Sequence, residues 1–143
     1  MPSIEIHKNQ ISEHTQEIND AVAIGLEKRP ATLGLHVSAC SISLVEIYLH
    51  TIGKISLGTM IKHEWFKQPI QGQKIAPLAE RKLGSDFEHK DEIFALMYVI
   101  EENRNKLIYG KPTKAAIEAT YESFYKLHAL IKDKLNELGV EIE

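Results

Sequence analysis

The sequence predicts an all-α fold, an up-and-down bundle of four to five antiparallel helices. Apolar residues recur at helical spacing through four long segments, and glycine or proline separates these segments. The chain has 143 residues, 43% hydrophobic and 26% charged, which suits one domain with one core. We therefore expect a single helical-bundle domain over residues 1–143, with its core from about residue 10 to 138 and about two thirds of the chain helical.

The first two helices are expected over about Ile11–Leu26 and Ala31–Ile52, with Pro30 between them and Gly53 after the second. Apolar residues of the first recur on one side, with Lys, Glu, Gln and Asn between them. Those of the second cover most of the helix circumference, so we expect it to be the central and most buried element.

Residues 53–75 are the least regular part, with a short helix expected across Thr59–Lys67. Another short helix is expected over Ala76–Leu83, and Asp86 is predicted to cap the next long helix. That helix should span about His89–Ile108 and end at Gly110.

Thr113 is the predicted N-cap of the last helix. Along it, apolar residues recur every seven positions: Ile117, Phe124, Ile131 and Leu138. Such a stripe suits packing along a groove of the bundle, and Gly139 should end the helix. SIEIH near the start and VEIE at the end both alternate, so a short terminal β pairing is an alternative there.

Charge and cysteine content narrow the possible classes of protein. A net charge of −3 argues against coating nucleic acid through bulk positive charge, although a local basic patch is compatible with it. The single cysteine, Cys40, excludes an internal disulfide and a multi-cysteine zinc site, and fits a reducing, cytoplasmic setting. The N-terminal residues have no apolar stretch after their charges, so no signal peptide is expected.

The apolar segment Ala31–Gly53 approaches the length of a membrane span. Its central Glu46 would cost roughly 2.5–3.5 kcal/mol in a bilayer, and polar side chains accompany it. We therefore predict a buried core helix and no membrane association, with a single membrane anchor as the alternative.

Several motifs of standard chemistry do not occur in the sequence. The seven histidines form no HxxxH, HxH or Glu-x-x-His pattern, so no metal site is expected. The sequence also contains no GxGxxG, GxxxxGK[ST] or GxSxG, so it offers no standard phosphate loop or hydrolase nucleophile, and no cofactor is expected.

The second helix carries a polar seam. His36, Ser43, Glu46 and His50 fall within roughly an 80° arc of an otherwise apolar cylinder. One interpretation is that the seam faces solvent. The other is that Glu46, one turn from His50, faces an internal cleft and pairs with a cation there.

The most basic part of this acidic protein begins near the end of the helix expected over about His89–Ile108. It contains Arg104, Lys106, Lys111 and Lys114, with Asn105 and Tyr109 among them. A cation at a helix C-terminus is favoured by the helix dipole, which is a sufficient structural reason for the charges. Arginine also binds phosphate bidentately, and a tyrosine ring can stack on a base.

The segment RNKLIYG resembles the Arg-Asn-x-x-x-His motif of HEPN-domain proteins, and SACSISLVEIYLHTIGK is similar to their apolar helix with an internal Glu. With the helix order, the resemblance covers about residues 10–138. It implies an all-α bundle, usually a homodimer in which the two motifs approach across a cleft. Many members are metal-independent ribonucleases, including toxins with antitoxin partners; others bind RNA or nucleotides without cleavage. A nucleotidyltransferase is the antitoxin partner to look for.

Carried over by position, Arg104 matches the motif arginine and Asn105 the residue after it, while Tyr109 stands where the family has its catalytic histidine. A phenol titrates at about pH 10 and is a poor base at neutral pH, although it can donate or stack. His50 or His63 can supply an imidazole only if the fold brings it near. The candidate catalytic residues are thus Arg104 and Tyr109, and the candidate binding residues are Asn105, Glu46, His50, Lys106, Lys111 and Lys114.

Three functions stay open. The first is a HEPN-like protein that binds RNA or a nucleotide with weak or absent cleavage. The second is an active HEPN-type ribonuclease, a toxin of a toxin–antitoxin pair. The third is a helical interaction module with no nucleic-acid role, in which Arg104 and Tyr109 only pack and cap.

Overall fold

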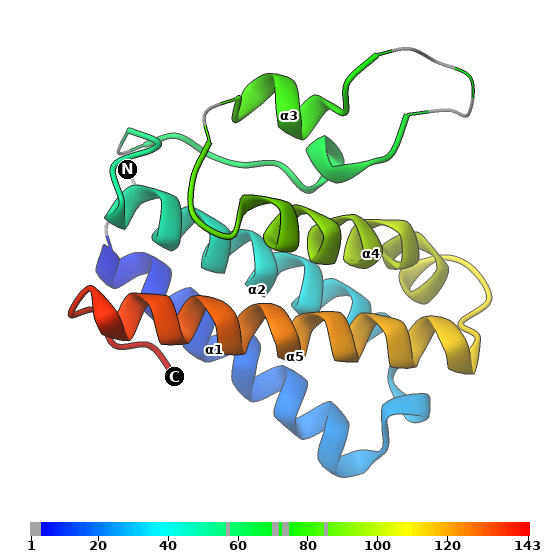
Figure 1. Ribbon diagram of the computed structural model, residues 1–143. Helices are drawn as coiled ribbons and strands as arrows, with labels where there is room; N and C mark the ends of the chain where they lie inside the picture. Colours follow the sequence, from blue (N-terminus) through cyan, green and yellow to red (C-terminus); the bar gives the residue numbers. More distant parts are fainter. Residues whose placement is uncertain (1–3, 57, 70–71, 73–74, 85) are drawn as a thin grey trace.

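The computed structural model describes residues 4–56, 58–69, 72, 75–84 and 86–143, and 73% of these are helical with no strand among them (Figure 1). The α-helices are α1 (Ile4–Ile24), α2 (Pro30–Thr51), α3 (Leu78–Lys82), α4 (Lys90–Ile108) and α5 (Lys114–Glu137). Two short 3-10 helices are η1 (Leu26–Lys28) and η2 (His63–Phe66). The prediction of an all-helical bundle is confirmed.

Helix α2 is the centre of the bundle, packed against α1, α4 and α5. Most of its residues are buried, including Leu33, Val37, Leu44 and Ile47 at 0% exposure. It is the one described helix long and apolar enough to cross a membrane, but 72% of its most apolar window is buried inside the protein. That burial is consistent with the predicted core helix of a soluble protein.

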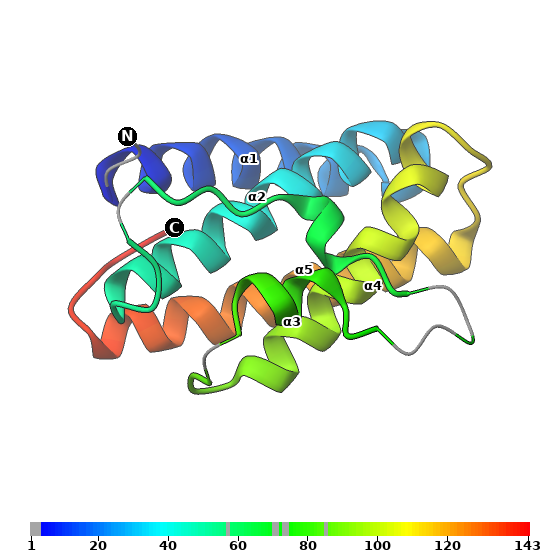
Figure 2. The ribbon, with the colours of Figure 1, turned by 90° about the horizontal axis from the view of Figure 1, so that it is seen from above.

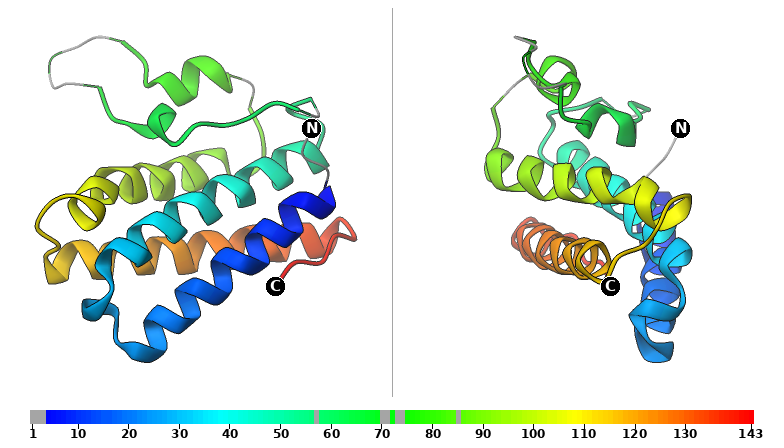
Figure 3. Two further views of the ribbon diagram at one scale, coloured as in Figure 1. Left: turned by 180° about the vertical axis from the view of Figure 1, so that it is seen from behind. Right: turned by 90° about the vertical axis from the view of Figure 1, so that its right-hand side faces the viewer.

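The four long helices run alternately in opposite directions, and α1 crosses α2 at an angle (Figures 1 and 3). Between α2 and α4 the chain leaves the bundle and lies over it as η2 and α3 (Figure 2). Phe66 of η2, 1% exposed, anchors this excursion edge-on to the Phe94 ring of α4, with 5.4 Å between ring centroids. The segment from η2 to α3 therefore covers one side of α2 and α4.

The two chain ends differ from the sequence-based expectations. Helix α1 begins at Ile4 rather than near Ile11, because His7 continues the buried face that Ile11 and Ile18 define. The alternative of a terminal β pairing is therefore wrong. After α5, Gly139 with φ 81° turns the chain in the left-handed region, and the last residues fold back to bury Ile142.

The caps of α4 and α5 follow different rules. Thr113 caps α5 as predicted, since its Oγ1 accepts a hydrogen bond from the Ala116 N–H at 3.1 Å. Asp86 does not cap α4: the N-cap is His89, with φ 65° and no side-chain capping bond. The short helices are also shorter than predicted. Helix α3 begins directly after Pro77, and η2 is preceded by Ile61, whose N–H donates to the Glu46 carboxylate.

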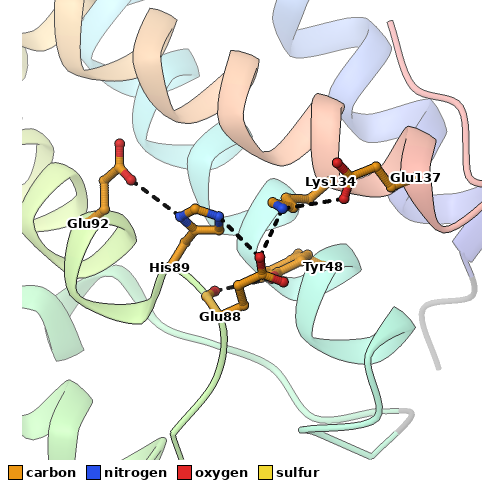
Figure 4. Close-up of polar contacts among 6 residues, drawn as sticks. All are labelled: Tyr48, Glu88, His89, Glu92, Lys134 and Glu137. Atoms are coloured by element: carbon orange, nitrogen blue, oxygen red, sulfur yellow. Dashed lines mark hydrogen bonds and ion pairs between the residues drawn. The ribbon is translucent and has the colours of Figure 1, made fainter.

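A polar cluster fixes the start of α4 against α2 and α5 (Figure 4). The Glu88 carboxylate accepts a hydrogen bond from Lys134 Nζ at 2.9 Å, and its backbone carbonyl accepts one from the Tyr48 hydroxyl at 3.1 Å. Lys134 also contacts Glu137 at 3.3 Å, and His89 lies 3.5 Å from both Glu88 and Glu92. We call these six residues the Glu88 cluster.

Candidate functional site

Arg104, near the end of α4, lines a cavity of about 410 Å³, which we call the Arg104 cavity. Its walls come from α1, α2, α4 and the segment Met60–Glu64 that precedes and begins η2. The polar wall residues are Gln10, His14, Ser38, Ser43, Glu46, Lys62, His63, Glu64 and Arg104. The fold therefore places the predicted arginine in a hollow built from segments far apart in the sequence.

The end of α4 can reach this position because Gly34 of α2 lets the two helices approach closely. A Cβ atom at Gly34 would lie 2.8 Å from Leu107 Cβ and 3.5 Å from the Arg104 carbonyl oxygen. No larger residue fits there without a shift of the helices. The glycine in α2 is thus one reason why Arg104 borders the cavity.

Glu46 is 7% exposed and Ser43 is 6% exposed, so the interpretation of the polar seam as a solvent face is wrong. Glu46 Oε2 accepts a hydrogen bond from the Ile61 N–H at 2.9 Å, and Oε1 lies 4.0 Å from His7 Nδ1. Burial raises the pKa of Glu46, and the Ile61 hydrogen bond opposes this rise. Glu46 thus holds the Met60–Glu64 segment in place, and it shares a cavity with Arg104 without pairing with it.

Arg104 has few polar partners. Its Nη1 donates to Asn105 Oδ1 at 3.3 Å, and its buried Nε has no hydrogen-bond partner among the described residues. A guanidinium has five N–H donors. The two terminal nitrogens carry four of these donors, and one of the four bonds Asn105, so up to three N–H groups remain for a ligand in the cavity.

His63 and Glu101 form a pair beside Arg104. His63 Nδ1 lies 2.8 Å and 3.1 Å from the two Glu101 carboxylate oxygens, and its Nε2 lies 3.6 Å from Glu64 Oε1. Burial raises the pKa of Glu101, while His63 and then Arg104 act to lower it. The Glu101 side chain is 10% exposed and that of His63 32%, so the carboxylate is shielded and the imidazole remains accessible.

His63 and Glu64 also separate the Arg104 cavity from a second one of about 430 Å³. The second cavity is lined by Lys67, Gln68, Tyr98, Glu101, Glu102 and Asn105 as well. Arg104 and Asn105, adjacent in the sequence, thus border different cavities. The sequence offered His63 only as one of two histidines that might approach, and Glu101 gave no signal, because its partner lies 38 residues away.

The remaining predicted residues lie outside the Arg104 cavity. Tyr109 is 80% exposed at the C-cap of α4, and Lys106, Lys111 and Lys114 are also exposed. Lys114 lies 3.9 Å from Glu118, one turn along α5. All four side chains are exposed, and none of them lines the Arg104 cavity.

His50 packs against His7 in the α1–α2 interface, with ring centroids 5.4 Å apart. Among the described residues, no three His, Cys, Asp or Glu side chains are placed to hold a metal ion.

The chain matches no protein-family model, no curated protein and no solved structure among those compared with it. The case for a function therefore rests on the site itself.

Proposed function

We propose that this protein binds RNA or a nucleotide in the Arg104 cavity, as a HEPN-like domain with weak or absent ribonuclease activity. The observation that carries the proposal is Arg104 itself, a cation at the wall of a cavity of about 410 Å³ with one hydrogen bond among the described residues. The planar guanidinium donates two parallel hydrogen bonds to a phosphate, and the phosphate keeps further oxygens for other donors in the cavity.

The charges around Arg104 favour an external anion. Two shielded carboxylates on this side of the bundle have other hydrogen-bond partners, because Glu46 accepts from Ile61 and Glu101 pairs with His63. Glu64, which also lines the cavity, is exposed to solvent. Lys62 and His14 add cationic or donor groups to the same walls. A phosphate entering the cavity would therefore meet donors that no internal carboxylate has already taken.

The rest of the cavity suits a nucleoside. Leu35, Ile42 and Met60 give it apolar walls, and Leu35 and Met60 are 48% and 66% exposed. Ser38 and Ser43 offer hydroxyls for a ribose or a base edge. The exposed Tyr109, with Lys106, Lys111 and Lys114, would extend contacts along an RNA strand beyond the cavity.

One observation favours an active ribonuclease as the second candidate function. His63, oriented by the shielded Glu101, lines the same cavity as Arg104, so an imidazole is present although Tyr109 replaces the motif histidine. Orientation of a histidine by a carboxylate is typical of a general base.

In that reaction His63 accepts the proton of a ribose 2′-hydroxyl, and the freed oxygen attacks the adjacent phosphorus. The bond between phosphorus and the 5′-oxygen breaks, and that oxygen takes a proton from water. The hydroxide left behind is neutralised by the proton on His63. The products are a 2′,3′-cyclic phosphate and a free 5′-hydroxyl, and Arg104 stabilises the charge that develops on the phosphoryl oxygens.

Binding is tested by titrating the wild type with a short unstructured RNA, the four nucleoside monophosphates and inorganic phosphate. Arg104→Ala should weaken binding of the preferred ligand by about 1.5–3 kcal/mol, the scale of a hydrogen bond to a charged group. Arg29→Ala is the matched control, because it removes the same charge from an exposed residue before α2. If the wild type binds nothing tighter than millimolar, the interaction-module interpretation replaces this one.

Cleavage is tested in parallel on the same RNA. If the protein cuts RNA through His63, His63→Gln should reduce the rate by about 10²–10⁴-fold, the usual contribution of a general base. Tyr109→Phe should leave the rate unchanged, since Tyr109 lies outside the cavity. The reverse pattern would assign the chemistry to Tyr109, and Tyr109→His would then raise the rate.

A further inference from the structure

Four of the seven histidines lie in one helix–helix interface, as two facing pairs. His7 of α1 faces His50 of α2, with ring centroids 5.4 Å apart, and His14 of α1 faces His36 of α2 at 5.1 Å. His7 and His14 are seven residues apart and so share a face of α1. Both histidines of α2 belong to its polar seam, which therefore faces α1 along its length.

The His14–His36 pair holds one proton between its rings. The two Nδ1 atoms lie 2.9 Å apart, so one of them must donate and the other accept. When both imidazoles are charged, each Nδ1 carries a hydrogen, and the two hydrogens point at each other. The contact then has to break.

The His7–His50 pair is more deeply buried. His7 is 1% exposed, and the four ring nitrogens of this pair have no hydrogen-bond partner among the described residues. The nearest carboxylate oxygen to His7 is Glu46 Oε1, 4.0 Å from Nδ1. A charge on either ring would be largely uncompensated, and two charges would repel each other inside the core.

Helix α1 depends on this interface for its place in the fold. Of the long helices described, α2 is the one whose backbone runs close to α1, whereas α2, α4 and α5 all pack against one another. At the chain end, the Ser12 hydroxyl donates to Glu143 Oε2 at 2.8 Å. Loss of the α1–α2 contact would thus leave the other three long helices packed together.

We propose that the two histidine pairs make the docking of α1 on α2 proton-sensitive, so that α1 leaves the bundle at mildly acidic pH while α2, α4 and α5 stay packed. Release exposes the apolar face of α1, which carries Ile11 and Ile18, and removes the wall that Gln10 and His14 give to the Arg104 cavity. The proposal does not depend on the proposed function.

The linkage has the required sign. Burial, and then the partner histidine, lower the pKa of both His7 and His14. A histidine with a lowered pKa binds fewer protons in the folded state than in the unfolded state, so stability falls as the pH drops below 6.5, the ordinary value for histidine.

Other titratable groups face the pairs and oppose the effect only partly. Glu46 of α2 faces His7, and Glu13 of α1 acts to raise the pKa of His14. Across the cavity, His14 also faces groups of α4 and the segment before η2: Lys62, His63, Glu64 and Arg104. Lys62 and Arg104 carry positive charge, which adds to the repulsion.

The test is hydrogen exchange of the full chain at pH 7 and pH 5, with each amide corrected for its intrinsic exchange rate. We expect protection in α1 to fall at least about tenfold relative to α5 at pH 5, the equivalent of one pKa unit. In His7→Phe/His14→Gln, which has no facing pair, the ratio of α1 to α5 protection should be the same at both pH values. His89→Asn, at the N-cap of α4 and outside the α1–α2 interface, is the matched control and should show the wild-type change in the ratio.

The proposal is overturned if wild-type α1 keeps its protection at pH 5, or if the double variant loses it to the same extent. A double variant that does not fold at pH 7 is replaced by His36→Gln, which removes one pair and should reduce the change in protection at pH 5. An equal change in His36→Gln and the wild type would then count against the proposal.

Discussion

The two ends of α4 both carry clusters of charged side chains, but only one has unused hydrogen-bonding capacity. At the start, every residue of the Glu88 cluster has a polar partner in the cluster, and the cluster joins α2, α4 and α5 (Figure 4). At the other end, Arg104 lies at a cavity with a single hydrogen bond, and its Nε is buried without a partner in the described chain. A satisfied cluster fixes helices, whereas an unsatisfied cation beside a cavity is arranged for a ligand.

The largest change in stability is expected from a substitution at Gly34, where α2 supports the Arg104 end of α4. Gly34→Val should lower the free energy of unfolding by about 2–3 kcal/mol, because its side chain would overlap Leu107 where α2 and α4 nearly touch. Urea unfolding followed by circular dichroism measures this change.

Ala31→Val is the control for Gly34→Val, since Ala31 is exposed on the same helix. It should change the stability by less than about 0.5 kcal/mol. Valine has a higher helix propensity than glycine, so propensity alone would make Gly34→Val slightly stabilising. If Gly34→Val loses no more stability than Ala31→Val, the close approach at Gly34 is not required to place Arg104.

The bundle could be predicted because apolar periodicity reports the buried face of each helix directly. Helix α2 was expected to be central from its apolar circumference alone. Thr113 was expected to be the N-cap of α5 from its place just before that helix. The start of α1 was missed because Ile4 and Ile6 alternate with Ser3, Glu5 and His7 in a pattern that also suits a strand. Burial of His7 against α2, a tertiary contact, decides between the two.

The site was predictable only in part. Arg104 stood out because several basic residues lie close to it in the sequence. Glu46 stood out because a carboxylate in an otherwise apolar helix must be paired or hydrogen-bonded if it is buried. Their actual partners come from elsewhere: Ile61 for Glu46, and the His63–Glu101 pair beside Arg104. Contacts across 15 and 38 residues leave no periodic signal, so no reading of one segment could have found them.

The second prediction concerns the charge on Glu46. Because burial raises its pKa, the folded state holds this proton more tightly than the unfolded state, and the stability contribution is lost as the pH rises above 4.5, the ordinary value. Glu46→Gln keeps an oxygen acceptor for the Ile61 N–H and removes the buried charge. Its Tm should therefore exceed that of the wild type by about 2–4 °C at pH 7, and the difference should vanish near pH 4.

Glu122→Gln, an exposed change on α5, should show no such pH-dependent gain. If Glu46→Gln instead lowers the Tm at pH 7, the ionised carboxylate is stabilised in the fold. The Arg104 end of α4 would then resemble the Glu88 cluster, with its charges satisfied internally.

The smallest effect is expected at the Glu88 cluster. Lys134→Met keeps the aliphatic stem and removes the ammonium that contacts Glu88 at 2.9 Å and Glu137 at 3.3 Å. The Glu88 and Glu137 side chains are 66% and 61% exposed, so water and salt already screen both pairs. We expect a slight decrease in Tm at low salt that disappears at 1 M NaCl, where the Debye length is about 3 Å.

Lys126→Met, on the exposed face of the same helix, is the control: it measures the change in Tm caused by losing a lysine charge without losing these contacts. A decrease in Tm that persists in high salt would show that Lys134 acts through packing, and the contrast between the two ends of α4 would then rest on the Arg104 cavity alone.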